Sequence, residues 1–228
     1  HDRGIAVIVD GAANLPPKAN LSRYVEAGAD LVTFSGGKAI RGPQATGILA
    51  GRGDLIRSAA LQHLDMDVAE TAWDPPEELF GTDDVDGVPR HGMGRGFKTG
   101  KEELVGLIRA LELFADEDEE ALSAEMYDRT ERIADGLAAE ASLSARVVAT
   151  EGAPEGTYRS QLIPSVVVEV DEDRAGTETV ALVRALRRED PKVFVGDGDV
   201  AEARFSISPV SLSDDEADYV VERVRANL

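Results

Sequence analysis

Two short apolar runs near the N-terminus constrain the fold of this chain more than any other feature. The first, IAVIV at 5–9, ends at Asp10, and the second, DLVTF at 30–34, follows a segment whose pattern predicts a short helix. Continuous β-branched runs are typical of parallel strands that are buried on both faces. A strand, a helix and a strand within about 30 residues form a βαβ unit. The sequence therefore predicts an α/β fold in which 5–9 is a central strand.

The elements that follow are consistent with such a fold. We expect the connecting helix to have Asn20 as its N-cap and to end at Gly28. TGILA at 46–50 predicts a third strand, and the apolar pattern of 54–64 predicts a helix. Residues 65–98 are rich in Gly, Pro and Asp and predict a long irregular segment, which usually carries function or links domains.

Beyond residue 98 the pattern predicts helices followed by a second set of strands. Thr99 and Glu102 have the spacing of a capping box before a helical apolar stripe, and a second long helix is expected near 118–141. The rest predicts a small α/β domain whose sheet is covered by helices. Its expected elements are the strands ARVVAT, PSVVVEVD, KVFVG and ARFSIS, a helix near 177–189 and a last helix capped by Ser213. We therefore expect one domain at 1–98 and a second at 99–228.

The charge of the chain argues against several classes of function. Asp and Glu total 44 against 24 Lys and Arg, a net charge of −20 at pH 7. Such a surface repels phosphates, so we expect no nucleic-acid partner. It also predicts a halophilic source, because high salt screens the repulsion between carboxylates.

Other classes are excluded by residues that are missing. The chain has no cysteine, which rules out disulfides, thiolate catalysis and cysteine–zinc sites, and the spacing of His1, His63 and His91 does not fit metal ligands. No apolar run approaches the ~18 residues of a membrane span, and the first residues do not resemble a signal peptide. We therefore expect no membrane partner, no metal and a cytoplasmic location.

Lys38 is one of only five lysines, and it lies in the glycine-rich segment SGGKAIRGPQATG that follows the second expected strand. Asp10 follows the first, and open α/β sheets bind ligands at the carboxyl ends of their strands. One interpretation is a simple ion pair between the two residues. The other is that Lys38 forms a Schiff base with an aldehyde cofactor while the carboxylate holds a ring nitrogen protonated. The two glycines would then allow close approach to the cofactor.

The residues around these positions resemble a known family. The segments VDGAANLPP, GADLVTFSGGKAIRGPQATGILAGR and GRGFKTGKEELVGL are similar to pyridoxal-phosphate (PLP) enzymes related to bacterial seryl-tRNA selenium transferase, and most to the D-glucosaminate-6-phosphate ammonia-lyase branch. The resemblance implies the fold-type-I architecture of aspartate aminotransferase. It covers the C-terminal part of the large domain and a complete small α/β domain. Because that family places its phosphate-binding turn well before the aspartate, we expect the N-terminal half of the large domain to be absent.

The resemblance also implies roles for individual residues. Lys38 matches the Schiff-base lysine, and Asp10 matches the partner of the pyridine nitrogen. Ala12 is placed to pack against the cofactor ring, and Ser35 matches a residue that contacts the cofactor phosphate. Gln44 lies within the segment that resembles the family, but the resemblance gives it no role.

Further cations are candidates for substrate binding. Arg90, Arg95 and Lys98 lie in a basic loop that the resemblance places near the active site, where they would bind an anionic group; a plain charged loop is the alternative. Arg204 resembles the small-domain arginine that binds a substrate carboxylate, for which a guanidinium is well suited. It would equally well face solvent.

Together these features predict a PLP-dependent enzyme, or the C-terminal portion of one. The resemblance implies an amino acid or amino sugar acid substrate, carbanion formation through Lys38, and β-elimination with loss of ammonia. Selenium transfer, which the negative charge disfavours, and aminotransfer are alternatives. A further alternative is a non-catalytic subunit that needs an N-terminal partner chain. Fold-type-I active sites are shared between subunits, so we expect a homodimer or a higher oligomer.

Overall fold

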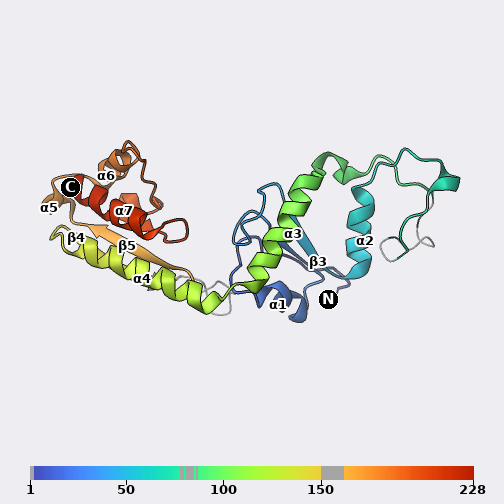
Figure 1. The fold of residues 1–228 in the computed structure, drawn as a ribbon, viewed down its shortest axis with the longest axis horizontal. Helices are drawn as coiled ribbons and strands as arrows, with labels where there is room; N and C mark the ends of the chain where they lie inside the picture. Colours follow the sequence, from blue (N-terminus) through green and yellow to red (C-terminus); the bar gives the residue numbers. More distant parts are fainter. Residues whose placement is uncertain (1–2, 78–79, 81–84, 86, 150–161) are drawn as a thin grey trace. The chain divides into compact units, whose positions relative to one another are not determined.

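The structure is a computed structural model, and it describes residues 3–77, 80, 85, 87–149 and 162–228 (Figure 1). The chain forms two compact units, His1–Glu117 and Asp118–Leu228, which we call the N-terminal and C-terminal units. Each is a mixed α/β unit with its own three-stranded sheet. Helix α3 (Lys101–Asp116) lies in the N-terminal unit, whereas the sequence placed it in the second domain at 99–228.

The sheet of the N-terminal unit contains the predicted βαβ unit. Its strands are β1 (Ile8–Asp10), β2 (Leu31–Ser35) and β3 (Gly47–Gly51), in that order. Helix α1 (Asn20–Glu26) connects β1 to β2, and these two strands are parallel, with Asp10 opposite Thr33. Strand β3 returns antiparallel to β2.

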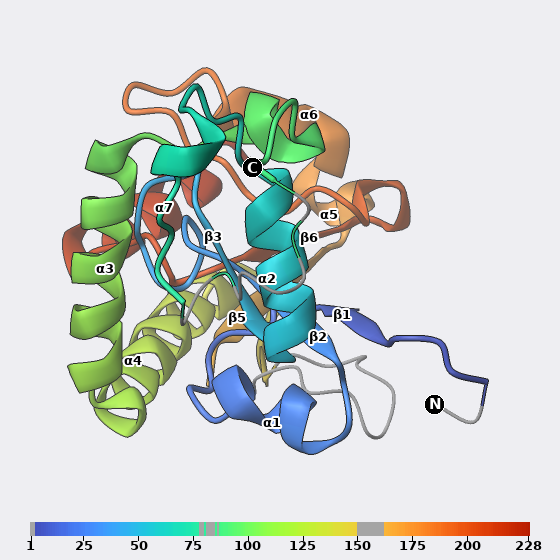
Figure 2. The same ribbon diagram turned by 90° about the vertical axis from the view of Figure 1, so that its right-hand side faces the viewer.

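The prediction that the first strand is central and buried on both faces is wrong for this structure. Only Ile8–Asp10 form a strand, and that strand is at the edge of the sheet, with β2 as its one neighbour. Figure 2 shows β1 at the margin of the unit, next to the N-terminus. Ile5 and Ile8 are 70% and 65% exposed as a result.

The core of this unit lies on one face of the sheet. Val32 and Phe34 point from β2 into it and are 0% and 2% exposed. The ring of Phe34 meets Tyr24 of α1, with centroids 6.3 Å apart. Alternation along the strand places Thr33 on the opposite face.

Helix α1 begins one residue earlier than predicted. Its N-cap is Ala19, and Asn20 is instead a buried residue whose Nδ2 donates to the carbonyl oxygen of Asn14 at 2.7 Å. A tertiary contact therefore takes the side chain that the sequence assigned to capping. Gly28 follows the C-cap with φ +104°, a conformation that favours glycine, as predicted.

The remaining helices of this unit are α2 (Gly53–Gln62), α3 and the short 3₁₀ helices η1 (Glu70–Ala72) and η3 (Met93–Phe97). The capping box predicted at the start of α3 does not form. Gly100 is the N-cap of α3, and Thr99 Oγ1 instead donates to the carbonyl oxygen of Ala45 at 3.3 Å. None of the described helices is both long and apolar enough to cross a membrane.

The C-terminal unit packs its helices against one face of an antiparallel sheet with strand order β4-β5-β6 (Figure 1). Its elements are α4 (Glu119–Ala138), β4 (Leu143–Ala149), β5 (Pro164–Val170), α5 (Glu172–Ala175), α6 (Thr179–Leu186), η4 (Val200–Glu202), β6 (Arg204–Ile207) and α7 (Asp214–Ala226). Alternate residues of β5 are buried, as expected of a strand with one covered face. The core comprises residues of all three strands and of α4, α6 and α7, with Ile133, Leu137, Val166, Val168, Leu186 and Val224 all at 0% exposure.

Two predictions for this unit have opposite outcomes. Ser213 caps α7 in a complete capping box with Glu216, as predicted. The expected strand KVFVG is not one, because this segment makes only an isolated bridge between Gly196 and Ser206.

Candidate active site

The candidate cofactor-binding residues lie at or just beyond the carboxyl ends of β1 and β2. Strands β1 and β2 are parallel neighbours, so the turns that follow Asp10 and Ser35 leave the sheet at the same end. Asp10 is opposite Thr33, and alternation puts Ser35 on the same face as both. Lys38 lies three residues further, in the turn after β2. This is the position at which α/β sheets bind ligands.

The turn that carries Lys38 is held by its own backbone. Gly42 N donates to the carbonyl oxygen of Gly36 at 2.8 Å, and Arg41 N donates to that of Lys38 at 2.8 Å. Gly36 N in turn donates to the carbonyl oxygen of Thr46 at 3.0 Å. The backbone of Lys38 is therefore fixed within a closed loop, while its side chain is exposed.

Packing on the chain itself explains the two glycines before Lys38. A Cβ on Gly36 would lie 2.1 Å from Oγ1 of Thr46 and 2.7 Å from Cδ1 of Leu107. A Cβ on Gly37 would lie 2.7 to 2.9 Å from three atoms of Gln44. The sequence interpretation attributed these glycines to approach of the cofactor; in the structure they are already required by segment 43–46 and α3.

Helix α3 supports the turn from behind. Ile40 is 1% exposed, and a Cβ on Gly42 would lie 3.3 Å from Ala110 of α3. Arg41, which has φ +59°, forms an ion pair with Glu117 just beyond the end of the helix. The turn that carries Lys38 thus contacts α3 at Leu107 and Ala110, and it contacts Glu117 just after the helix.

Asp10 has a local hydrogen bond and an open side chain. Its Oδ1 accepts from the backbone N–H of Ala12 at 3.0 Å, which fixes the carboxylate relative to the turn after β1. Asp10 is exposed, while Ala12 and Ser35 are half-buried. In the described part of the chain, neither Asp10 nor Lys38 is within ion-pairing distance of an opposite charge, so the simple ion pair considered from the sequence is not formed.

The basic loop contributes two of its three cations to a common hollow. Arg95 and Lys98 line a hollow of about 400 Å³ together with His63, Asp65, Met66, Phe97 and Thr99. The hollow lies between η3 and the segment after α2, and Gly94 packs its backbone on the ring of His63. Thr99 connects this loop to Ala45, one residue beyond Gln44. The sequence did not single out His63 as a neighbour of the two cations, because their separation along the chain hides the contact.

Arg90 lies apart from that hollow. Its Nη2 donates to the carbonyl oxygen of Val68 at 3.3 Å. The neighbouring His91 has φ +53°, and its backbone N–H donates to Oδ1 of Asp65 at 2.9 Å. This hydrogen bond is the main reason that the pKa of Asp65 is lowered. These contacts fasten the loop to the segment after α2 and give Arg90 a structural partner.

Arg204 belongs to the C-terminal unit and is engaged there. It is the first residue of β6, on the face away from the core, and it pairs with Glu202 and, at 3.8 Å, with Asp199. A substrate carboxylate would have to displace these two carboxylates. A role for Arg204 in substrate binding therefore stays a prediction, and these ion pairs favour the alternative of a surface residue.

The donor groups at the sheet edge fit pyridoxal phosphate. The cofactor needs an amine for its aldehyde and a carboxylate for its ring nitrogen, and the turns after β1 and β2 place Lys38 and Asp10 at the same edge. Ser35 adds a hydroxyl on the Asp10 face.

The arrangement of helices and strands gives the fold class: the chain has the fold of part of a fold-type-I PLP enzyme. A solved structure of D-glucosaminate-6-phosphate ammonia-lyase matches 99% of the chain with a TM-score of 0.68 and 24% identity, and the chain covers 50% of it. No family model matches the chain.

Similar proteins by sequence point to the predicted branch. The chain is 29% identical over 224 residues to 5'-C-glycyluridine monooxygenase-decarboxylase of Streptomyces sp, covering 98% of the chain. It is 24% identical over 221 residues to D-glucosaminate-6-phosphate ammonia lyase of Salmonella typhimurium, covering 97% of the chain. It is 24% identical over 231 residues to L-seryl-tRNA(Sec) selenium transferase of Carboxydothermus hydrogenoformans, covering 96% of the chain. The chain is thus related to the ammonia lyases and selenium transferases that its motifs indicated, and these families are PLP-dependent.

The chain spans about half the length of these relatives. It covers 46%, 48% and 42% of the three proteins, respectively. What those whole proteins do is therefore carried to this chain only as a proposal.

Proposed function

We propose that this chain is the C-terminal part of a PLP-dependent enzyme in which Lys38 binds the cofactor aldehyde and Asp10 binds the ring nitrogen. The observation that carries the proposal is the parallel pairing of β1 and β2, which brings the turns after Asp10 and Ser35 to one edge of the sheet. Ser35 and Ala12 complete the cofactor contacts supplied by this chain. When bound, the cofactor supplies an electron sink for a carbanion at the substrate α-carbon.

Lys38 has a second role in this proposal. Its Nζ takes the proton from the α-carbon as a general base. Its exposed position on a fixed turn suits this role, because the backbone is held while the side chain stays free to move. Loss of a β-substituent and release of ammonia would follow, on an amino acid or amino sugar acid.

The hollow beside η3 supports an anionic substrate. Arg95 and Lys98 outnumber the one carboxylate of the hollow, Asp65, in a chain of net charge −20, and two cations can bind one phosphate or carboxylate group. We propose that Arg95 and Lys98 of this hollow bind the acidic group of the substrate. Arg90 and Arg204 take no part in that contact.

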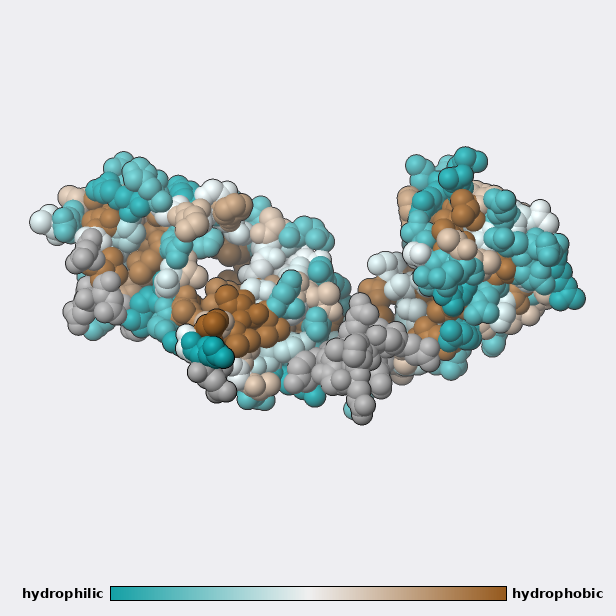
Figure 3. Space-filling view, turned by 180° about the vertical axis from the view of Figure 1, so that it is seen from behind, coloured by the Kyte–Doolittle hydropathy of each residue, from teal (hydrophilic) through white to brown (hydrophobic). Residues whose placement is uncertain are grey.

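The face of the sheet that carries Asp10 exposes apolar side chains of β1 and β3, which supports a partner polypeptide. Ile8 and Leu49 lie on this face and are 65% and 39% exposed, and Ile5 beside them is 70% exposed. Figure 3 shows hydrophobic residues gathered in one area of the N-terminal unit. An edge strand with exposed apolar side chains invites pairing with further strands. We propose that a segment equivalent to the other half of the relatives covers this face, in an assembly that is dimeric or larger and cytoplasmic.

A second reaction is favoured by one comparison. A relative that is 29% identical over 224 residues is named a monooxygenase-decarboxylase. A carbanion at the same α-carbon is also formed by loss of carbon dioxide, so decarboxylation is the alternative. Measuring ammonia against carbon dioxide in the products of candidate substrates separates the two reactions. Selenium transfer and aminotransfer rank after these.

Reductive labelling tests the cofactor proposal. The purified chain is incubated with pyridoxal phosphate, reduced with borohydride, and digested for mass spectrometry. The pyridoxyl group should be found on Lys38 in preference to Lys101, which is also exposed. Lys38→Ala should lose the label while its circular dichroism spectrum is unchanged. An even distribution over the lysines would overturn the proposal.

The DNA sequence before this chain tests whether the proposed covering segment is encoded next to it. The DNA that precedes the codon for His1 should encode, in an open reading frame, a glycine- or serine-rich phosphate-binding turn. Co-expression of that segment should then give a complex that binds the cofactor more tightly than the chain alone. A preceding sequence without such a turn would favour the alternative, a subunit that needs a separate N-terminal partner chain.

A further inference from the structure

Gln44 touches the peptide that precedes Lys38. Its Nε2 donates to the carbonyl oxygen of Gly37 at 2.9 Å, across seven residues of chain. The contact is close along its whole length, because a Cβ on Gly37 would lie 2.7 Å from Cα, 2.8 Å from Oε1 and 2.9 Å from Cδ of Gln44. The side chain of Gln44 therefore lies flat against the backbone of Gly37.

This hydrogen bond fixes the peptide plane between Gly37 and Lys38. The peptide is planar, so holding its carbonyl oxygen also holds the N–H and Cα of Lys38. The other bonds of the turn involve the carbonyl groups of Gly36 and Lys38 and leave that of Gly37 to the Gln44 amide. Gly37 has no side chain that would otherwise restrict its rotation.

Gln44 is itself held in place by its neighbours. Thr46 Oγ1 donates to the carbonyl oxygen of Pro43 at 2.6 Å, and Pro43 contacts Gly106 of α3, where a Cβ would lie 2.9 Å from its ring. The donor thus projects from a segment braced on a helix toward the peptide next to the lysine.

We propose that Gln44 is a positioning residue that sets the direction in which Lys38 leaves the turn. The inference rests on the proposed function of Lys38 as the cofactor-binding amine. Gln44 does not touch the cofactor or the substrate in this proposal; it acts through the Gly37 peptide. Loss of its donor would leave the fold intact but let the Lys38 backbone rotate.

The test replaces Gln44 by methionine, which has nearly the same length and no hydrogen-bond donor. Gln62→Met is the matched control, since Gln62 is an exposed glutamine of α2 in the same unit. In the full 228-residue chain, reductive labelling with pyridoxal phosphate is scored as the ratio of label on Lys38 to label on Lys101. We expect Gln44→Met to lower this ratio about fivefold, the factor that a typical net hydrogen bond is worth, and Gln62→Met to leave it unchanged.

Two readouts do not depend on the cofactor. Trace acetylation with acetic anhydride gives the same Lys38 to Lys101 ratio for a small neutral reagent. Hydrogen-exchange mass spectrometry over 36–42 reports whether the N–H groups of Arg41 and Gly42 open faster. Both should change in Gln44→Met, while the thermal unfolding midpoint matches that of Gln62→Met, because a purely structural role would move the midpoint instead.

The outcomes separate this inference from the proposed function. If wild-type chain labels Lys38 selectively and Gln44→Met does so equally, the positioning role is overturned and the proposed function stands. If wild-type chain shows no selectivity for pyridoxal phosphate, the proposed function fails. The acetylation ratio and the exchange rates then decide on Gln44 alone, and values equal to wild type overturn its role.

Discussion

Arg52 Nη1 lies 2.9 Å from Oδ1 of Asp30, a carboxylate whose side chain is only 5% exposed. The second oxygen of Asp30, Oδ2, accepts from the backbone N–H of Val7 at 2.7 Å. Asp30 precedes β2, Val7 precedes β1 and Arg52 follows β3, so one carboxylate connects all three strands of the N-terminal sheet. This network is at the end of the sheet opposite to Lys38, and it holds the strand register on which the candidate site depends.

Acid should weaken this network. The hydrogen bond from Val7 and then that from Arg52 lower the pKa of Asp30 below its ordinary value of 3.8. A lowered folded-state pKa means that the stabilisation is fully present above pH 3.8 and is lost as the pH falls toward the folded-state value. Asp30→Asn should therefore lower the unfolding midpoint at pH 7 and reduce its dependence on pH below about 4.

Thermal unfolding followed by circular dichroism between pH 7 and pH 3 measures both effects. Asp67→Asn, which changes an exposed carboxylate of the same unit, is the control and should keep the wild-type dependence of the midpoint on pH. Equal acid responses in wild type and Asp30→Asn would show that Asp30 does not link stability to pH.

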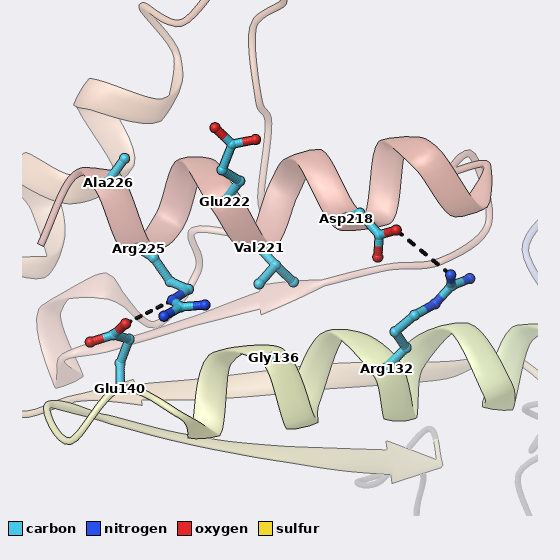
Figure 4. A pocket seen from close by; sticks show the side chains of 8 residues that line it. All are labelled: Arg132, Gly136, Glu140, Asp218, Val221, Glu222, Arg225 and Ala226. Atoms are coloured by element: carbon cyan, nitrogen blue, oxygen red, sulfur yellow. Dashed lines mark hydrogen bonds and ion pairs between the residues drawn. The ribbon is translucent and has the colours of Figure 1, made fainter.

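Close packing of two helices gives a second prediction. Figure 4 shows a pocket between α4 and α7, flanked by the ion pairs Arg225–Glu140 at 2.7 Å and Arg132–Asp218 at 3.7 Å. Gly136 of α4 faces Val221 of α7, and a Cβ on Gly136 would lie 2.8 Å from Cγ1 of that valine. Gly136→Ala gains about 1 kcal/mol of helix propensity but overpacks this contact, at a cost of about 1–3 kcal/mol.

A double-mutant cycle isolates the clash. Val221→Ala removes the valine methyl groups, so alanine at 136 should be better tolerated in that background than in wild type. We expect the double variant to be more stable than the sum of the single changes by at least about 1 kcal/mol, measured by urea unfolding. If the effects of the two single substitutions on the free energy of unfolding add within about 0.5 kcal/mol, the Cβ at position 136 does not clash with Val221.

The sequence predicted those features that local chemistry determines. Strand β2, the positive φ of Gly28 and the Ser213 capping box each depend on neighbouring residues, and the structure has them. The position of β1 at the sheet edge could not be predicted, because an apolar run shows that burial is favoured and not which neighbour provides it. Asn20 and Thr99 were assigned to caps but bond to Asn14 and Ala45, contacts that spacing along the chain does not show.

The same limit applies to the candidate site. Asp10 and Lys38 were predicted because Asp10 ends one strand and Lys38 follows the next, and a parallel βαβ unit brings the ends of its two strands together. Gln44 received no role from the sequence, since its hydrogen bond to Gly37 depends on how the turn closes. Arg204 matched a pattern, but its carboxylate neighbours Glu202 and Asp199 became visible only in the folded chain.

The net charge of −20 predicts that salt stabilises this chain, as the halophilic interpretation requires. Raising KCl from about 0.1 M to about 1 M shortens the screening length from about 10 Å to about 3 Å, which weakens repulsion between exposed carboxylates more than it weakens close ion pairs. The unfolding midpoint should therefore rise with KCl.

A triple variant that neutralises the exposed acids Glu26, Asp67 and Glu131, as Gln, Asn and Gln, should be more stable than wild type at low salt and should respond less to KCl. Sucrose at equal osmolality should stabilise both proteins equally, because it acts by exclusion from the surface and not through charge. A midpoint that is constant or falls with KCl would contradict the halophilic interpretation and would mean that the ion pairs, such as Arg129–Asp214 at 3.0 Å, outweigh the repulsion.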